Sequence, residues 1–448
     1  MSEKSTRRDV LKWTGAGAAA LAASGLPEPA LANPPHFKLY LMIFNNLQSR
    51  MIWTDLIGKQ FARLGIDVNS SYQPPSVVIA RRANDSGKTH VEGGFDMYSE
   101  RIYYNGLAPS PEALFHSKNV PPNGQNYYRI ADKQIDTAIE NYSHAITEQD
   151  RKTAMTAFVK RWYEIEPLHI VFYPEEVIIT NPKLKGMEST TYNPVFYPRP
   201  EDWTIEGATG DVTATFASWQ PPSQLIPMYG SGYNESNIFG PVYNALLEYD
   251  SWANKKLAPA LAESVKGSPD GKNWVISLRK GVKWHSGEEF TAEDVKFTWD
   301  TIIDKTYASL FQATLSTVMG SRDAYKITGT HEITVTLPQP NMLFHDFLLP
   351  VIAIMPKHAY KDIKPEELRG HVISTWLGTF PVKTSDGKVF EAKGGVGTGP
   401  WIPQGFDPSR KAYKYSKNEN YWKKTDGNVK TFYIVNIEGA DPLLSAIK

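Results

Sequence analysis

The strongest constraint on the fold is a strand–helix–strand pattern near the start of the chain. Residues 37–44 (FKLYLMIF) have the length and apolar character of a buried strand. Apolar side chains then recur at helical spacing through residues 48–64, and Gly65 ends the expected helix before a second strand opens at residues 66–68. Its expected apolar side consists of Met51, Ile52, Leu56, Ile57, Phe61 and Leu64. Two strands joined by a helix favour an α/β domain.

The remainder of the chain mixes further helices and strands. Helices are expected at residues 131–146 and from Thr147 onward, where Thr147 and Asp150 have the spacing of a capping box. The second of these helices should present an apolar face of Met155, Phe158, Val159 and Trp162. Strands are expected at residues 168–173, 177–180, 273–279 and 333–337. Another capping box, formed by Thr291 and Asp294, should open a helix that runs to Ile303.

Composition excludes several classes of function. Lysine plus arginine equals aspartate plus glutamate at 48 each, so the chain lacks the basic excess of a nucleic-acid-binding protein. There is no cysteine among the 448 residues, which excludes disulfides, thiol catalysis and Cys-ligated metals. The length suggests two or three domains.

The first 32 residues have the order of an export signal. Arg7 and Arg8 lie in a charged region, a weakly hydrophobic stretch follows, and Ala30 and Ala32 form an A-x-A cleavage site. The paired arginines favour a twin-arginine signal over an ordinary secretory signal that happens to carry them. We therefore expect the twin-arginine export machinery as a partner, and a mature protein that is soluble and periplasmic or otherwise extracytoplasmic.

Sequence motifs of common enzymes are absent. The chain has no G-x-S-x-G, no H-E-x-x-H and no P-loop, and no two histidines lie four residues apart. The glycine-rich run at residues 394–399 lacks dinucleotide-binding spacing, because Pro400 stands where the last glycine belongs. The acidic cluster of Glu288, Glu289, Glu293 and Asp294 is interpreted as a solvated helix start rather than a general-acid pair. We predict no catalytic residues, no cofactor and no metal site.

Three motifs in the second half of the chain resemble one family. Residues 257–299 contain LAESVKGSPDGKNW and GVKWHSGEEFTAEDV, residues 396–402 read VGTGPWI, and residues 417–422 read KNENYW. Together they resemble the cluster 5 solute-binding proteins, the dipeptide, oligopeptide, nickel and oligosaccharide receptors of ABC importers. The resemblance implies an α/β, two-lobe periplasmic-binding-protein type II fold with an extra domain. It also implies that the lobes close on a small ligand and that ABC importer permease subunits are partners.

Residues 38–203 resemble the carboxyl-terminal part of the same family. The resemblance is carried by residues 65–68 (GIDV), 94–97 (GFDM), 127–136, 151–171 and Trp203. We thus expect a circularly permuted and incomplete order: a signal at 1–32, the carboxyl-terminal part at 33–203, a connector at 204–211 and the amino-terminal part at 212–448. The first part would supply half of the second lobe and a return strand. The last would supply the first lobe, the extra domain and the entry to the second lobe.

The resemblance also suggests where a ligand binds. Peptide receptors of the family pair the ligand's amino group with an aspartate, and Leu107 falls at that position here. A buried ammonium without a counter-charge is costly, which counts against a peptide held through its free amine. Tyr103, Tyr104 and Asn105 suit an oligosaccharide, although a core strand followed by a loop explains the tyrosines equally well. Trp219 and Gln220 fall where the family's first strand reaches the cleft.

Two other functions remain open from the sequence. The chain could be a ligand-binding sensor or chaperone-like protein on the same fold, which a neighbouring permease gene would argue against. It could also be an inactive rearranged fragment, which would lack a cooperative thermal transition.

Replacing both Arg7 and Arg8 by lysine tests the export signal. We expect unprocessed precursor to accumulate in the cytoplasm of a bacterium that has the twin-arginine pathway, because lysine does not satisfy that pathway's signal. Immunoblots of cytoplasmic and periplasmic fractions measure the outcome. Normal processing of the double variant would favour the ordinary secretory route.

Overall fold

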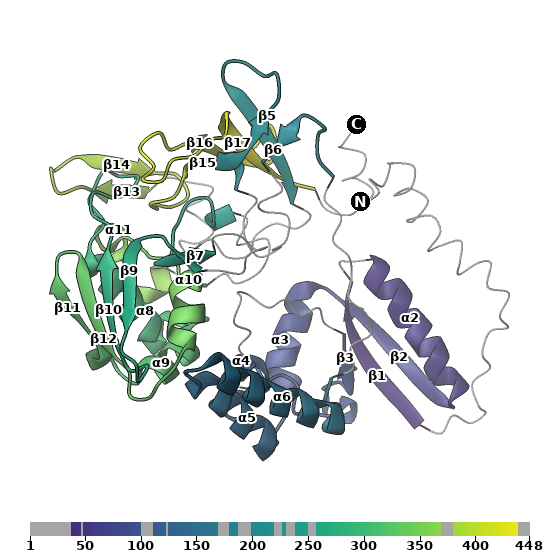
Figure 1. The fold of residues 1–448 in the computed structure, drawn as a ribbon. Coiled ribbons are helices and arrows are strands. Elements are labelled where there is room, and N and C mark those ends of the chain that lie inside the picture. Colours follow the sequence, from purple (N-terminus) through teal and green to yellow (C-terminus); the bar gives the residue numbers. More distant parts are fainter. Residues whose placement is uncertain are drawn as a thin grey trace, which may run out of the picture. The chain divides into compact units, whose positions relative to one another are not determined.

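The computed structural model describes ten segments of the chain. They are residues 37–45, 48–99, 111–121, 124–168, 179–186, 199–218, 226–229, 238–249, 257–368 and 380–437 (Figure 1). The chain divides into two compact units between Arg101 and Ile102. This division by compactness does not test the predicted order of family parts, whose junction lies a hundred residues later.

A parallel three-stranded sheet organises the first unit. Strand β1 (Phe37–Phe44) lies between β2 (Ile66–Gln73) and the short β3 (Met97–Tyr98), and both neighbours run parallel to it. Helix α2 (Gln48–Arg63) connects β1 to β2, while α3 (Pro75–Asp85) and the 3₁₀ turn η1 (His90–Glu92) connect β2 to β3. The predicted strand–helix–strand unit is therefore confirmed, with β1 at the predicted bounds.

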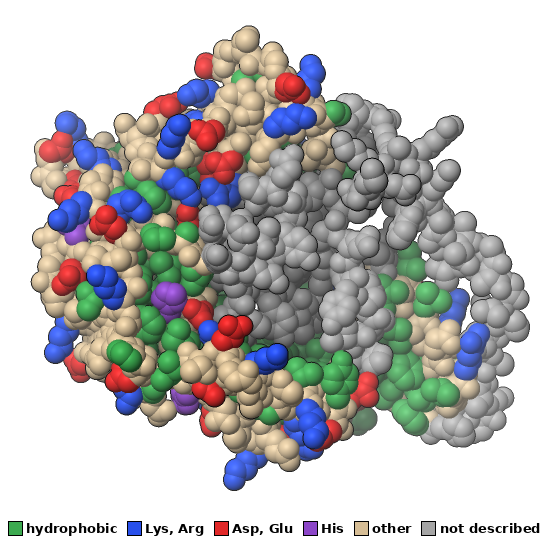
Figure 2. Space-filling view, in the orientation of Figure 1, with side chains coloured by type: hydrophobic (Ala, Val, Ile, Leu, Met, Phe, Trp, Pro, Cys, Tyr) green, Lys and Arg blue, Asp and Glu red, His purple; other side chains and the backbone are tan. Residues whose placement is uncertain are grey.

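The core of the first unit is small. Met42 and Phe44 on one face of β1 pack against Val78 of α3, and Leu41 and Ile43 on the opposite face are also buried. The expected apolar side of α2 is only partly covered, because Leu56 is 37% exposed and the adjoining Leu64 is 68% exposed. In Figure 2, hydrophobic side chains of this unit remain visible at the surface.

A helical pair follows at the start of the second unit. Helices α5 (Lys133–His144) and α6 (Glu148–Ile165) pack together, preceded by α4 (Glu112–Phe115) and η2 (Ser117–Asn119). Thr147 caps α6 by accepting a hydrogen bond from the Asp150 amide at 3.1 Å, as the spacing predicted. Phe158 is buried and Trp162 packs on the same core, but Val159 is 42% exposed, so its assignment to the apolar face is wrong. Position 159 lies one residue, about 100°, past Phe158 around the helix.

An antiparallel sheet with two helices follows in the second unit. The strand order is β11 (Tyr325–Gly329), β12 (Glu332–Thr336), β10 (Asn273–Leu278) and β9 (Ala262–Gly267). The predicted strand at 273–279 is present as β10, and its residues Trp274, Ile276 and Leu278 alternate into the core. Helices α8 (Ala292–Ile303) and α9 (Gln312–Met319) contribute Val295, Trp299 and Leu315 to the same core.

The capping box at the start of α8 is present, but its acid is not solvated. Asp294 is 4% exposed and accepts hydrogen bonds from the Thr291 amide, the Lys357 amide and the Trp284 indole N–H. The interpretation of this acidic cluster as a solvated helix start is thus wrong for Asp294. The chain returns across α8 through α11 (Lys357–Tyr360), which covers the carboxylate and supplies a donor.

A second sheet completes the unit. Its order is β15 (Trp401–Asp407), β16 (Ala412–Lys417), β17 (Val429–Asn436) and β6 (Val212–Ser218), and β17 runs parallel to β6. Smaller elements accompany the two sheets: the strands β4 (Leu184–Lys185), β5 (Thr204–Ile205), β7 (Leu247–Tyr249), β8 (Leu257–Pro259), β13 (Phe380–Lys383) and β14 (Val389–Ala392), and the helices η3 (Pro200–Asp202), η4 (Lys305–Tyr307), η5 (Arg322–Ala324), η6 (Phe344–Leu348) and α10 (Leu349–Val351). One continuous core extends over both sheets.

Residues 199–205 dock on this second sheet. Trp203 is 2% exposed and meets the Phe432 ring edge to face, with centroids 5.8 Å apart. Asn428 accepts from the Ile205 amide at 2.9 Å and donates to the Ile205 carbonyl at 3.1 Å. Residues 169–173 and 177–178 of the two predicted strands 168–173 and 177–180 lie outside the described residues, and the described residues 168, 179 and 180 are not in a strand.

Hydrogen exchange should reveal the unequal cores. We expect strong amide protection in residues 257–340 and weak protection in residues 37–100, because buried apolar packing is extensive in the former and sparse in the latter. Mass spectrometry of peptides from the native protein measures both regions at once. Equal protection would contradict the prediction that residues 37–100 belong to an incomplete half-lobe.

Candidate ligand-binding site

The predicted ligand residues all lie outside the described part of the chain. Tyr103, Tyr104 and Asn105 fall in residues 100–110, and Trp219 and Gln220 fall in residues 219–225. The signal residues Arg7 and Arg8 and the cleavage-site residues Ala30 and Ala32 also lie outside it. The structure therefore does not test these assignments. It does show the strands that precede each predicted cluster in the sequence.

Tyr103 follows the carboxyl end of a parallel strand. Strand β3 ends at Tyr98, and the next residue, Ser99, donates its amide to the Met42 carbonyl of β1 at 3.0 Å. Tyr103 is the fourth residue after Ser99, a span of at most about 14 Å of extended chain. Ligands of open α/β sheets bind outside the carboxyl ends of the strands. The predicted residues 103–105 thus follow the carboxyl end of β3 in the sequence, and this is the edge at which such sheets bind ligands.

In the sequence, Trp219 and Gln220 directly follow strand β6 of the other sheet. Strand β6 ends at Ser218, which is level with Asn436 at the end of the parallel strand β17. The two residues follow immediately after this carboxyl edge. Both predicted clusters therefore leave parallel strands at the edge favoured for ligands.

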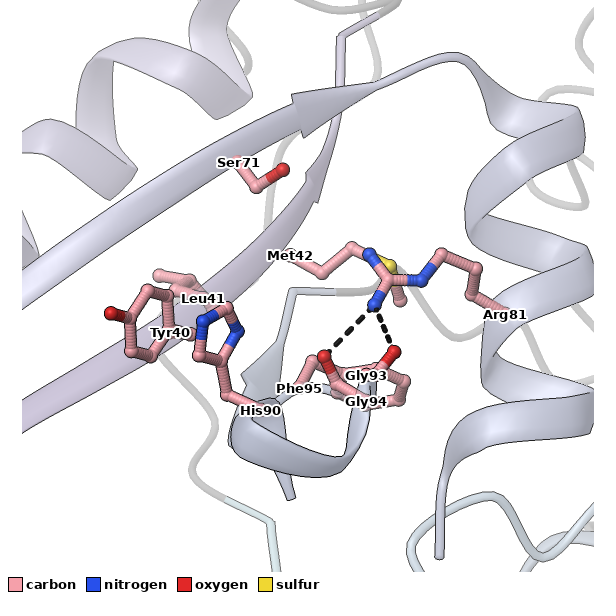
Figure 3. A pocket seen from close by; sticks show the side chains of 9 residues that line it. All are labelled: Tyr40, Leu41, Met42, Ser71, Arg81, His90, Gly93, Gly94 and Phe95. Atoms are coloured by element: carbon pink, nitrogen blue, oxygen red, sulfur yellow. Dashed lines mark hydrogen bonds between the residues drawn. The ribbon is translucent and has the colours of Figure 1, made fainter. Parts of the chain in front are cut away.

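A pocket in the first unit lies between β1, α3 and η1. It is lined by Tyr40, Leu41, Met42, Ser71, Arg81, His90, Gly93, Gly94 and Phe95 (Figure 3). Its volume of about 110 Å³ is below the several hundred Å³ of a typical small-molecule site. Arg81, the charged group that lines it, donates to the Gly93 and Gly94 carbonyls at 2.9 and 2.8 Å. We assign Arg81 to holding η1 against α3, not to binding a ligand.

The glycine turn at residues 397–400 is packed into the protein core. A side chain at Gly397 would place its Cβ 1.7 Å from the Val242 carbonyl oxygen, so only glycine fits there. His285 holds the turn from the other side: its Nε2 donates to the Gly399 carbonyl at 3.0 Å, and its Nδ1 accepts from the Gly397 amide at 3.3 Å. This pair of contacts requires the neutral ring with its proton on Nε2. Burial lowers the pKa of His285 to about 4, in agreement with a neutral ring.

Asn244 joins two of the motifs on which the family resemblance depends. Its Oδ1 accepts from the Thr398 hydroxyl at 3.1 Å and from the Trp422 indole at 3.3 Å, while its Nδ2 donates to the Tyr421 hydroxyl at 3.3 Å. Burial raises the pKa of Tyr421 well above its ordinary value, so the phenol stays protonated. The motifs at 396–402 and 417–422 therefore stabilise the second sheet in this structure.

Trp401 has a structural role. Its ring is fully buried, and its indole N–H donates to the Glu201 carboxylate at 3.3 Å. Sequence reasoning missed His285, Asn244 and Glu201 because their partners lie between 112 and 200 residues away. The local spacing of residues does not predict contacts between residues that are so far apart in the sequence.

Metal and membrane features are absent from the part of the chain that the structure describes. No group of three or more histidine, aspartate or glutamate side chains there is placed to hold a metal ion. None of the helices described combines the length and hydrophobicity that a membrane span needs. On the face shown in Figure 2, acidic and basic side chains are interspersed over the second unit.

Comparison with known proteins finds a family match over the last part of the chain. Residues 256–447 match the family model for bacterial extracellular solute-binding proteins, family 5 Middle. This part of the chain is therefore similar to family 5. The matched segment begins at β8 and contains the antiparallel sheet, the glycine turn and the strands β15, β16 and β17.

Several curated relatives align with parts of the chain. It is 27% identical over 180 residues to the oligopeptide-binding protein AppA of Bacillus subtilis, covering 40% of this chain and 29% of AppA. It is 36% identical over 95 residues to the periplasmic oligopeptide-binding protein OppA of Haemophilus influenzae, covering 21% of this chain and 17% of OppA. It is 27% identical over 206 residues to the nickel-binding periplasmic protein of Escherichia coli, covering 45% and 33%. Each alignment thus spans a third or less of the family 5 relative.

Solved structures also match part of the chain. The structure of AppA from Bacillus subtilis in complex with a nonapeptide matches 53% of this chain and 43% of AppA, with a TM-score of 0.44 and 21% sequence identity.

A His285→Asn variant tests the neutral state of the buried imidazole. The unfolded chain takes up a proton near pH 6.5, whereas folded His285 stays neutral down to about pH 4, so the parent protein loses stability as the pH falls through this window. The stability advantage of the parent over the variant should shrink by about 3 kcal/mol between pH 7 and pH 4. Urea denaturation at several pH values measures it.

The comparison of parent and variant controls for the other titrating groups, because both proteins contain them. Burial raises the pKa of Asp294 to about 6, but Asp294 titrates in both proteins and cancels from the comparison. A stability difference that stays constant from pH 7 to pH 4 would contradict the buried, neutral assignment of His285.

Proposed function

We propose that the protein is an extracytoplasmic solute-binding receptor of an ABC importer. It captures a small polar ligand between two lobes and delivers it to the permease, without catalytic turnover. The observation that carries this proposal is the family 5 match over residues 256–447. The signal-like residues 1–32, with Arg7 and Arg8, support export through the twin-arginine machinery.

The two parallel strand edges support the location of the ligand. The predicted clusters at 103–105 and 219–220 follow β3 and β6 at their carboxyl ends. The two sheets belong to different compact units. Closure of two lobes would bury the ligand, and the ligand would favour the closed form through its higher affinity for it.

An oligosaccharide or an oligopeptide fits the proposal best. AppA and OppA are named as oligopeptide-binding proteins, which favours a peptide-like ligand. Leu107 stands where family peptide receptors place an amine-pairing aspartate, which favours a ligand without a free ammonium group. Tyr103 and Tyr104 add rings on which the C–H faces of sugars stack.

The proposed arrangement keeps the permuted order of the sequence analysis. Residues 33–203 would form half of the second lobe and the return strand, residues 204–211 the connector, and residues 212–448 the first lobe with the extra domain. The docking of residues 199–205 on the second sheet supports this arrangement. It joins the end of the expected carboxyl-terminal part to the sheet built mainly from the expected amino-terminal part.

A thermal-shift screen tests the receptor function. Mixed oligopeptides, oligosaccharides and nickel chelates are added separately, and we expect one class to raise Tm, since a ligand at 100 times Kd stabilises the native state by about 2.7 kcal/mol. We expect little effect from ordinary peptides with a free amino terminus. Submicromolar binding of such a peptide in calorimetry would overturn the amine argument, and no shift with any class would count against the receptor.

Variants then test the site. Tyr104→Ala and Trp219→Ala should each weaken the ligand found in the screen by tenfold or more, because they remove large stacking surfaces. Tyr163→Ala is the matched control, since Tyr163 is an 80% exposed tyrosine on α6. Calorimetric Kd values that are unchanged in both site variants would show that the ligand binds elsewhere.

A further inference from the structure

The helices α4, α5 and α6 form a module with a core of its own. Phe115, Ile135, Ile139 and Phe158 are buried together, and Trp162 packs on them with its ring centroid 4.6 Å from that of Phe115. Arg161 strengthens the module from the edge by donating two hydrogen bonds to Asp132, the residue that caps α5. Residues of this module do not join the continuous core that spans the two sheets within the described chain.

The module touches the remainder of its unit through a small junction. Tyr142 of α5 and Ala154 of α6 are buried against Leu343, and Met342 donates its amide to the Ser143 carbonyl at 3.3 Å. These few contacts are sparse in comparison with the cores on either side of them. A junction of this kind separates at a lower free-energy cost than either core unfolds.

An ion pair fixes the junction. Arg151 of α6 pairs with Asp346 of η6, and the two side chains are 27% and 20% exposed. Asp346 is itself oriented by His345, whose Nδ1 lies 2.7 Å from the second carboxylate oxygen. The His345 ring stacks on Trp274 of β10, with centroids 5.5 Å apart and planes 16° apart. The ion pair therefore connects α6 through η6 to the antiparallel sheet.

The helix that carries Asp346 has unusual geometry. Residues Phe344–Leu348 form a π-helix, a form that is rare and occurs frequently at functional sites. Phe344 and Leu348 point into the main core, while Asp346 and His345 meet α6 and Trp274. The extra residue in the turn thus allows one short helix to serve both the core and the junction.

We propose that the junction is a releasable clasp, in which the Arg151–Asp346 pair holds the helical module against the 257–368 region. In the arrangement proposed above, the module belongs to the second lobe and residues 257–368 belong to the extra domain. The clasp then sets the ratio of docked to separated lobes in the absence of ligand. This role in capture rests on the proposed function, whereas the clasp itself rests on the contacts.

Spin-label distances test the clasp without a ligand. The chain has no cysteine, so Tyr163→Cys on α6 and Lys326→Cys on β11 give two unique label sites, both exposed. We expect one dominant distance in the otherwise unchanged protein. Arg151→Met should increase the ratio of separated to docked molecules roughly tenfold, because it removes the partly buried ion pair that joins α6 to Asp346.

Lys152→Met is the matched control, since it removes the same charge from the neighbouring, exposed position of α6. Asp346→Asn should act like Arg151→Met, and the double variant should be no more open than either single one. Hydrogen exchange of β10 and β12 should remain slow in all of them.

Three results would overturn the clasp. They are a distance distribution for Arg151→Met that equals the control, additive effects of the two substitutions, and loss of protection in β10 together with the module. The last would show that the junction belongs to one cooperative core. Because no ligand is used, each of these results leaves the receptor function standing, and a failed ligand screen leaves the clasp standing.

Discussion

The docking of residues 199–205 on the β15–β16–β17–β6 sheet is the interaction on which the second unit depends. Glu201 is 1% exposed and lies beneath the Trp401 indole, with the Arg199 guanidinium 3.5 Å away. A carboxylate buried this deeply is costly unless its hydrogen bonds and counter-charge are in place, so the segment and the sheet require each other. Gly427 permits the close approach, because a Cβ there would lie 2.4 Å from the Glu201 carbonyl oxygen.

Local patterns in the sequence predicted the elements well. The bounds of β1, the start of α6 at Thr147, the alternation of β10 and the capping box before α8 all depend on residues within a few positions of one another. The errors at Val159 and Asp294 arose where a distant segment decides burial: α11 covers Asp294, and nothing described covers Val159. The family motifs were recognisable, but their roles in holding His285 and Asn244 depend on contacts across more than a hundred residues.

The candidate site was predictable only by resemblance. The topology supports its position, because the residues at 103–105 and 219–220 follow parallel strands at their carboxyl ends. The described cores of this molecule differ in size. The two sheets of the second unit share one large core, whereas the parallel sheet of the first unit and the helical module have small cores. Regions of low local stability are those that move when a receptor closes on its ligand.

The central claim is that the segment before residue 206 and the sheet after residue 211 form one body, joined by packing and not only by the connector. Gly207 and Gly210 have positive φ and open space around them, so a protease site inserted between them is accessible and leaves the docked residues intact. Cleavage there, followed by size-exclusion chromatography under native conditions, tests the claim most directly. The account predicts that both fragments elute together as one species. Separate elution of the two fragments would show that residues 199–205 do not hold the chain together, and would contradict it.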